Sequence, residues 1–536
     1  MTERRIAAVV MPELLLELAL RRGEALREAP FAVVWSAEPG EEATAARPLE
    51  AVSVQAASFG VQVGQSIAEA RVLAAALRIV ELSRQHVEKE LGHLAEALLG
   101  FGMTAALAMP DTVWVDVSGS AHLVGGEQAL ARELADAMQE LGHRARVALA
   151  PGPILAQAFA RWSTSVAQGQ RDLCVIAASD VAARAQELPI VALPVSMDLR
   201  TWLVQLGVLT FGQLMELPRA EVAARLGEAA TSVLALAQGI DDAPLEAHRP
   251  AVVPSESMEW DEAVSGLEPL KFVLRGLTSR LSARLNGRGE AAQHLQLTLN
   301  HDRSLARLSG APPHHILELQ LATPLWRAEE LLRVLSTRLE RVTLQAPTVG
   351  VTLSAPGVVR ALGRQLDLAR VVSKTTGTEL LPALVAELSQ DIGPSRIGTL
   401  TLLDAHRPEA RARLKPAFRK RAPAPSKRRQ KKSAQIPLVS IKSVDGRNRQ
   451  PTRLLPTPVP LAVPFRRGVT LGFDQRLYTI ESVRFAERLE SVEWWTGRAV
   501  ARDYVWLTLK GADGVLEALA YVDRVSGKRY LQGLFD

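Results

Sequence analysis

The sequence predicts a multidomain protein of the α+β class, and three observations support this prediction. The chain has 536 residues, several times the usual length of one domain. Residues 252–355 follow a β-α-β-β-α-β pattern, in which leucines recur at helical spacing and then alternate as in strands. A basic segment at 411–449 separates most of the chain from a tyrosine-rich end. We therefore expect folded cores on both sides of a linker.

The first 166 residues predict one α/β layer. Residues 5–11 have the apolar run of a buried strand, and Pro12 can open the helix that follows. The short turn Met109-Pro110-Asp111 between two apolar runs indicates a β-hairpin. Further strands are expected at 31–35, 50–54, 103–108, 112–118 and 144–150, and helices at 66–76, 87–101, 126–141 and 153–162.

Residues 167–245 predict a run of short helices. The stretch Leu206–Gly212, followed by Leu214 and Leu217, indicates a helix, a glycine turn and a second helix. Such a hairpin can direct backbone N–H groups at a phosphate, because a helix N-terminus favours anions. Gly207 and Gly212 are therefore candidate DNA-binding residues, and an ordinary helical connection is the alternative.

The β-α-β-β-α-β pattern of residues 252–355 predicts a self-contained domain with one open sheet face. Its strands are expected near 253–260 and at 295–299, 316–321 and 349–353, and its second helix at 331–339. The first helix carries the stripe Leu270, Leu274, Leu277, Leu281 and Leu285. Arg280, Arg284 and Arg288 add positive charge there and are candidate DNA contacts. Residues 357–410 are expected to be a helical extension.

Residues 411–450 predict a disordered basic linker. The stretch 411–449 holds 14 Lys and Arg against the single acid Asp445, a net charge of +13, whereas the whole chain is only +5. It has too few large apolar residues to offset the entropy of ordering. The segment can bind DNA phosphates by releasing counterions, and a solvated spacer is the alternative. The candidate contacts are Lys427, Arg428, Arg429, Lys431 and Lys432.

Residues 451–536 predict a small β-rich domain. All four tyrosines and three of the nine tryptophans fall within the last 60 residues, among alternating apolar positions and glycine turns. Cys174 is the single cysteine, so the sequence predicts no disulfide framework and favours a reducing, cytoplasmic setting. We find no signal peptide, membrane span, phosphate-binding glycine loop or metal motif, and we expect no cofactor.

Several motifs in this order resemble those of the Y-family translesion DNA polymerases. They are Phe59-Gly60-Val61, Asp111-x-x-x-x-Asp116-Val117-Ser118-Gly119, the glycine hairpin and the β-α-β-β-α-β domain, and they span residues 4–355. The resemblance implies a palm at 1–166 with a fingers insertion at about 25–80, a thumb at 167–245 and a little finger at 252–356. The stretches 116–127, 493–497, 502–504 and 530–536 are similar to a polymerase-like subfamily encoded in bacterial mutagenesis cassettes.

The resemblance also shows what the palm lacks. Polymerases hold two Mg²⁺ ions with carboxylates, and the three ligand positions fall on Met11, Asp111 and Thr112. A thioether is a poor ligand for Mg²⁺, so one carboxylate remains. Glu13, two residues beyond Met11, is the alternative ligand.

The groups that contact the triphosphate in active members are replaced as well. A tyrosine, an arginine and a lysine of the family correspond to Val54, Ala57 and Gln157. Losing anionic ligands and cationic contacts together predicts a site that binds neither metal nor nucleotide. Asp111 is then expected to be a turn residue, and Asp116 to be structural.

A short apolar island lies inside the basic linker. Gln435, Ile436, Pro437 and Leu438 are similar to sliding-clamp ligands, in which a glutamine binds at the rim of a pocket and a leucine fills it. Ser440 replaces the usual bulky end, so we expect modest affinity.

The resemblance therefore implies a catalytically inactive adaptor in the damage-induced (SOS) response. Its expected partners are damaged or primer-template DNA, the β sliding clamp, an error-prone replicative-type polymerase subunit and an ImuA-like recombinase-related protein, at the nucleoid. Two alternatives stay open. One is a competent Y-family polymerase that uses Asp111 and Glu13, and the other is a structural protein that binds nucleic acid through the linker and the glycine hairpin.

Overall fold

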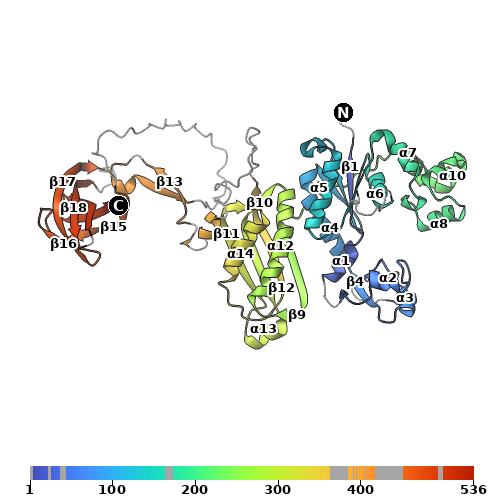
Figure 1. Cartoon of the computed structure of the whole chain (residues 1–536), viewed down its shortest axis with the longest axis horizontal. Helices are drawn as coiled ribbons and strands as arrows, with labels where there is room; N and C mark the ends of the chain where they lie inside the picture. The colour runs from blue at the N-terminus through green and yellow to red at the C-terminus, as the bar shows by residue number, and fades with distance from the viewer. Residues whose placement is uncertain are drawn as a thin grey trace. The chain divides into compact units, whose positions relative to one another are not determined.

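The structure is a computed structural model, and it describes most of the chain. The described residues are 4–21, 26–36, 44–162, 173–361, 384–389, 392–393, 395–403, 405–416, 451–492, 499–512 and 514–535. The predictions for Lys427–Lys432, for Gln435–Leu438 and for Glu493–Gly497 lie outside these residues. The chain divides into two compact units, residues 1–393 and 394–536, and each is described by itself (Figure 1).

The palm of the first unit is a five-stranded sheet in the order β5-β6-β1-β7-β8. Alternate residues of β1 enter two different cores, because successive side chains of a strand point to opposite faces. Ala7 and Val9 pack beneath α4 and α5, while Ala8 and Val10 pack beneath α6 and the thumb helices. The strands are β1 (Ile6–Val10), β5 (Thr104–Ala108), β6 (Thr112–Asp116), β7 (Arg146–Ala150) and β8 (Leu173–Val175). The helices are α1 (Leu14–Leu20), α4 (Arg84–Leu98), α5 (Glu127–Glu140) and α6 (Pro153–Trp162), with short 3-10 turns η2 (Leu99–Phe101) and η3 (Ala121–Val124).

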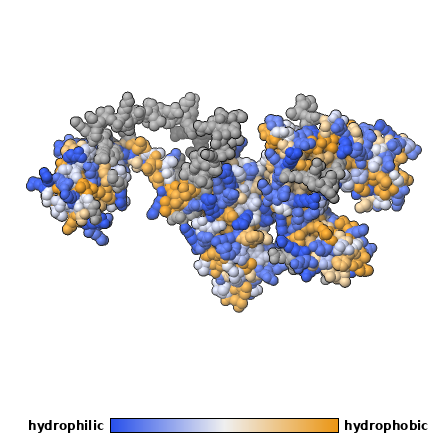
Figure 2. Space-filling view, in the orientation of Figure 1, coloured by the Kyte–Doolittle hydropathy of each residue, from blue (hydrophilic) through white to orange (hydrophobic). Residues whose placement is uncertain are grey.

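The fingers form a separate three-stranded sheet in the order β3-β2-β4. Ser53 joins strand to helix, since its hydroxyl accepts hydrogen bonds from the N–H groups of Phe31 and Ala56. The elements are β2 (Phe31–Trp35), β3 (Ala51–Val52), α2 (Val54–Ser58), α3 (Ile67–Leu73) and β4 (Arg78–Leu82). Several large apolar side chains are exposed here, among them Val54, Phe59 and Val72. Figure 2 shows hydrophobic colour gathered over this part of the first unit.

The thumb consists of short helices around a second core. It comprises η4 (Ala178–Asp180), α7 (Val181–Gln186), η5 (Ile190–Ala192), α8 (Met197–Gln205), α9 (Phe211–Glu216), α10 (Arg219–Leu226), η6 (Gly227–Ala229) and α11 (Ala230–Ala237). The sequence-based pattern of helix, glycine turn and helix is confirmed, because α8 and α9 flank Gly207, whose φ of 80° suits glycine.

The little finger confirms the β-α-β-β-α-β prediction. Its sheet has the order β11-β10-β12-β9, and α12 and α14 cover the face that carries Leu295, Leu297 and Leu299. The elements are β9 (Ser255–Val264), α12 (Leu267–Gly287), β10 (Glu290–His301), α13 (Arg303–Ser309), β11 (His314–Leu325), α14 (Ala328–Leu339) and β12 (Thr348–Arg360). None of the helices in the described ranges is long and apolar enough to cross a membrane.

The second unit is β-rich, as predicted, but its start differs from the prediction. Residues 398–402 were expected in a helical extension, and 411–416 in a disordered linker. Instead β13 (Gly398–Leu402) pairs with β14 (Ala412–Pro416) across the 3-10 turn η7 (Pro408–Ala410). The alternation of threonine and leucine at 399–402 favours a strand, because β-branched residues suit an extended backbone.

A six-stranded antiparallel sheet in the order β15-β20-β19-β18-β17-β16 follows. Its main core lies on one face, around Ile480, Leu507 and Leu531. The strands are β15 (Arg453–Leu461), β16 (Thr470–Phe473), β17 (Arg476–Val492), β18 (Val500–Gly511), β19 (Gly514–Asp523) and β20 (Arg529–Phe535).

Candidate functional site

The palm positions the three predicted ligand residues at the ends of two neighbouring strands. β1 pairs antiparallel with β6, so that Val10 lies opposite Thr112. The N–H of Met11 donates a hydrogen bond to the carbonyl of Asp111, with 2.8 Å between the two atoms. The sequence therefore brings Met11, Asp111 and Thr112 together, as the resemblance implied.

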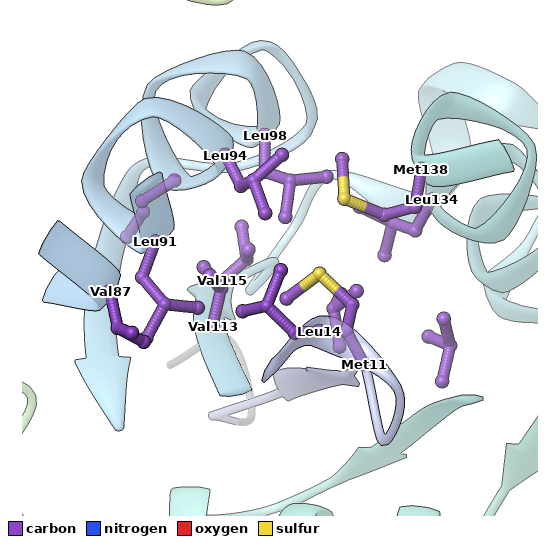
Figure 3. Close-up of a cluster of buried hydrophobic side chains, with 14 of the residues drawn as sticks. Met11, Leu14, Val87, Leu91, Leu94, Leu98, Val113, Val115, Leu134 and Met138 are labelled. Atoms are coloured by element: carbon purple, nitrogen blue, oxygen red, sulfur yellow. The ribbon is translucent and has the colours of Figure 1, made fainter. Parts of the chain in front are cut away.

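Met11 belongs to the hydrophobic core. Its side chain is fully buried, and Figure 3 shows its sulfur among Leu14, Val113, Val115 and Met138. The position that the resemblance assigns to a metal-binding carboxylate is here an apolar packing residue, because the thioether fills space between α4, α5 and the sheet.

Asp111 and Thr112 are buried, and their polar side-chain atoms are paired with each other and with Gln157 and Arg161. The guanidinium of Arg161 pairs with the Asp111 carboxylate. The hydroxyl of Thr112 donates to Oδ1 of Asp111 at 2.8 Å, and it accepts from Nε2 of Gln157 at 3.2 Å and from Nη2 of Arg161 at 3.3 Å. Gln157 and Arg161 are one turn apart on α6, so both reach the same strand end.

The cluster therefore holds one carboxylate and one guanidinium. Arg161 was not foreseen from the sequence, although its spacing of four residues from Gln157 on an amphipathic helix was a usable signal. No group of three or more His, Cys, Asp or Glu side chains within the described ranges could hold a metal ion. Glu13, the alternative ligand, is exposed at the start of α1.

The other palm and fingers positions can also be placed. Val54 is 83% exposed on the first turn of α2, and Ala57 is exposed on the same helix, so neither brings a polar group to the palm. Asp116 accepts a hydrogen bond from the N–H of Ser118 at 3.0 Å, which agrees with a local structural role at the end of β6.

The two thumb glycines differ from each other. Gly207 lies in the turn between α8 and α9, flanked by the exposed Leu206 and Leu209. Gly212 lies inside α9, and a Cβ there would be 3.2 Å from the carbonyl oxygen of Gln186. Gly212 therefore permits α9 to pack closely against α7.

The prediction that Arg284 contacts DNA is wrong for this arrangement of the first unit. Arg284 is 1% exposed. Its guanidinium donates to Glu96 of α4 at 2.8 Å and to Glu256 of β9 at 2.7 Å, so it joins the little finger to the palm. Arg280 donates to Glu256 at 3.0 Å, and Arg288 donates to the Ala251 carbonyl at 2.9 Å. The charges seen in the sequence are thus paired within the protein.

The buried ion pairs of Arg284 with Glu96 and Glu256 lie where two groups, Glu96 and His93, have shifted pKa values. Burial alone would raise the pKa of Glu96, but the nearby His248 and the hydrogen bond and charge of Arg284 outweigh burial and lower it to about 2. Burial, assisted by the charge of Arg284, lowers the pKa of His93 to about 4. Glu96 is therefore an anion and His93 is neutral at pH 7.

Comparisons with known proteins match both halves of the first unit. Residues 10–161 match the model of the impB/mucB/samB family, and residues 255–368 match the C-terminal domain of that family. Protein ImuB of Caulobacter vibrioides is 27% identical over 352 residues, covering 66% of this chain and 73% of the relative. DNA polymerase IV of Moorella thermoacetica is 25% identical over 348 residues, covering 61% and 80%.

Solved structures of polymerases are also similar. An insertion ternary complex of Dbh DNA polymerase has a TM-score of 0.38 and 15% identity, covering 65% of this chain and 98% of that one. DinB from Sulfolobus solfataricus has a TM-score of 0.38 and 17% identity, covering 67% and 100%. Residues 10–161 and 255–368 of this chain thus match the models of the impB/mucB/samB family and of its C-terminal domain, and the chain is similar to ImuB.

Proposed function

We propose that this chain is a non-catalytic, Y-family polymerase-like adaptor in DNA-damage-induced translesion synthesis. The observation that carries the proposal is the palm cluster, in which Arg161 pairs with Asp111 while Met11 is buried in the core.

The palm residues do not fit a pair of Mg²⁺ ions. Mg²⁺ demands oxygen ligands in a nearly octahedral arrangement, and two-metal sites share carboxylates between the ions. The cluster offers one carboxylate, and a guanidinium and a hydroxyl already bind it. A cation at this position would have to displace Arg161 and leave that guanidinium, whose side chain is only 26% exposed, beside a second positive charge.

A chain without polymerase chemistry would act by binding. The relatives named ImuB and DNA polymerase IV support a role on DNA during lesion bypass. The basic segment 411–449 offers phosphate contacts, and Gln435–Leu438 offers a contact for the β sliding clamp. The error-prone polymerase subunit and the ImuA-like protein are the further partners of the adaptor, which would work in the cytoplasm at the nucleoid.

Primer extension by the purified full chain, in Mg²⁺ or Mn²⁺, tests the absence of catalysis. We expect no template-dependent incorporation from the wild-type chain or from Asp111→Ala. Incorporation that Asp111→Ala abolishes would instead favour the competent polymerase that uses Asp111 and Glu13.

Damage-induced mutagenesis in cells tests the adaptor role. Asp111→Ala should retain mutagenesis, whereas Gln435→Ala with Leu438→Ala should lose it together with binding to the clamp. Truncating interface anchors of this kind typically costs more than about 1 kcal/mol each. Thr452→Ala, just outside the linker, serves as a control for expression and handling. If the double variant still binds the clamp, the contact lies elsewhere, and Gln532–Phe535 is the next segment to test.

A further inference from the structure

A row of three tyrosines crosses the sheet of the second unit. Tyr504 of β18 lies directly opposite Tyr521 of β19, and Tyr521 lies opposite Tyr530 of β20. The ring centroids are 5.4 Å and 5.1 Å apart, and the second pair is stacked. Residues that pair across neighbouring strands project from the same face of the sheet. We call this side of the sheet the tyrosine face.

Arginine side chains lie between the rings of the tyrosine face. The guanidinium of Arg502 is 4.2 Å from the ring centroid of Tyr521 and donates to the Tyr504 hydroxyl at 3.0 Å. Farther along the same face, the guanidinium of Arg484 is 5.2 Å from the ring centroid of Trp506. Cations over aromatic faces and stacked rings thus occur together across four strands, β17 to β20.

The tyrosine face is not the side on which the unit builds its main core. Leu507, Ala520 and Leu531 alternate with the tyrosines along the same three strands and pack on the opposite face. An antiparallel sheet with one face in its core commonly carries polar side chains on the other. On the tyrosine face, Tyr504 and Tyr521 form a second, smaller buried cluster with Leu489 and Leu519, and Trp506 and Tyr530 are partly buried against it.

The tip of the β13–β14 hairpin, residues 405–411, reaches this face. The carboxylate of Glu409 accepts a hydrogen bond from Nη1 of Arg502 at 2.8 Å. Arg411 is 3.8 Å from Glu487, which lies opposite Tyr504 on β17. With the hairpin tip in this position, Tyr504 and Tyr521 are only 2% and 4% exposed.

The contacts of the hairpin tip are easy to give up. All five residues of β13 are exposed, including Leu400 at 74% and Leu402 at 85%, so little apolar surface holds the hairpin in place. A two-stranded hairpin is marginally stable by itself, and partly exposed ion pairs contribute little. The tip can therefore leave the sheet at low cost.

Arg502 also has an unused hydrogen-bond donor. Its Nε is buried and has no hydrogen-bond partner among the described residues. Buried donors are normally paired, so this one indicates an acceptor that the described residues do not supply. A guanidinium that binds one carboxylate through Nη1 can bind a phosphate through two parallel donors.

We propose that the tyrosine face binds single-stranded nucleic acid, and that the hairpin tip occupies the site until a strand displaces it. A base would stack on Tyr530, whose ring is only partly buried, because every base has a flat face and such stacking tolerates any sequence. A backbone phosphate would replace the Glu409 carboxylate on Arg502. This site adds to the proposed function and does not depend on the palm being inactive.

Equilibrium binding of two probes by the full chain tests the proposal. The probes are a fluorescent 20-nucleotide oligothymidine and an abasic oligomer of the same length, which keeps the phosphates but has no bases. Glu409→Ala removes the internal competitor and should tighten oligothymidine binding by about two- to fivefold. Glu490→Ala is the matched control, because it removes an exposed carboxylate that pairs with Arg524 in the same unit.

Tyr530→Ala measures how much the stacking of bases contributes to oligothymidine binding. In the Glu409→Ala background it should weaken oligothymidine binding by about tenfold and leave the abasic oligomer unchanged. Tyr478→Ala removes the fourth tyrosine, which packs with the opposite face, and should not discriminate between the probes. Melting curves of each variant identify any that is unfolded.

Two outcomes would overturn the proposal. One is that Glu409→Ala and Glu490→Ala change oligothymidine affinity equally. The other is that Tyr530→Ala affects both probes alike, since a site for bases must distinguish them. Competition by polyglutamate, without any preference for thymidine over abasic probe, would assign the face to an acidic protein segment instead.

Discussion

The guanidinium of Arg161 pairs with the carboxylate of Asp111 at the palm position where the resemblance to Y-family polymerases predicts metal ligands. Arg161 is held by α6 and Asp111 by the turn between β5 and β6, so the pair joins a helix to a strand end. The charge of the lone carboxylate is thus neutralised from within the chain.

Arg161→Gln should destabilise the first unit by about 1–2 kcal/mol, because it leaves the buried Asp111 without its cation. Urea unfolding of the full chain measures the change. Arg184→Gln is the control, since its pair with Glu187 is exposed, and it should cost less than about 0.5 kcal/mol. A cost no greater than that of the control would mean that the pair contributes nothing to the fold.

Glu96→Gln should be more severe, at about 3–5 kcal/mol, because it leaves Arg284 buried with an incomplete set of partners. The pKa of about 2 also sets a pH window. The carboxylate is more acidic in the folded chain than in the unfolded chain, so its contribution is complete above about pH 4.5 and is lost as the pH falls toward 2. Lys271→Ala, which breaks partly exposed ion pairs of α12, the helix that carries Arg284, should leave the urea midpoint unchanged.

His93 predicts a separate loss of stability at mildly acidic pH. Its pKa falls from 6.5 to about 4 on folding, so the unfolded chain binds the proton more tightly. Stability should be complete above about pH 6.5 and should decrease by about 2–4 kcal/mol as the pH falls to 4. His93→Gln should flatten the dependence over this range, whereas His314→Gln, at an exposed position, should retain it. A wild-type profile that is flat between pH 6.5 and 4 would contradict the shift.

Gly287→Ala should separate two packed helices. A Cβ at Gly287 would lie 2.0 Å from the carbonyl oxygen of Glu96 and 2.6 Å from that of Ala97, so α12 would have to move away from α4. We expect a loss of about 1–3 kcal/mol. Gly276→Ala is the matched control on the same helix, where a Cβ meets nothing within 4 Å. That variant should be neutral or more stable by about 0.5–1 kcal/mol, because alanine favours helix.

Neutralising Lys427, Arg428, Arg429, Lys431 and Lys432 should weaken DNA binding and flatten its dependence on salt. Each lost phosphate contact removes about 0.7 to 0.9 from the slope of log affinity against log salt concentration. Filter binding at several salt concentrations gives the slope. An unchanged slope would place the phosphate contacts on the folded units.

The sequence was most informative about elements that pack against elements close to them in the chain. The leucine stripe of α12 and the alternating leucines of β10 indicated the little finger, because the periodicity of an element records the face that it buries. The same periodicity could not identify the partners of Arg284. Glu96 is 188 residues away in the chain, so the sequence displays the charges but not their pairing.

The palm site was predictable in part for the same reason. Once the resemblance assigns the ligand positions, the residue types of Met11 and Thr112 show that carboxylates are missing there. The register that places Met11 beside Asp111 comes from the pairing of β1 with β6, which lie far apart in the sequence. The role of Arg161 was not predicted, because a cation near the end of an amphipathic helix ordinarily faces solvent. The β13–β14 pair was not predicted, because β13 is fully exposed and an exposed strand has no buried face to impose an apolar pattern on its sequence.

The contact between α4 and α12 bears on how this protein can be divided into fragments. The two segments that match the family models are separated in sequence by the thumb, yet Glu96 and Arg284 share one buried ion pair and Gly100 approaches Gly287. A fragment that ends before residue 255 would expose the carboxylate of Glu96 and the part of the α4 backbone against which Gly287 packs. The little finger expressed alone would expose an arginine with one of its two carboxylate partners missing. Fragments whose ends follow the two family matches would therefore divide the buried contact between α4 and α12. A soluble fragment should instead keep residues 4–361 together.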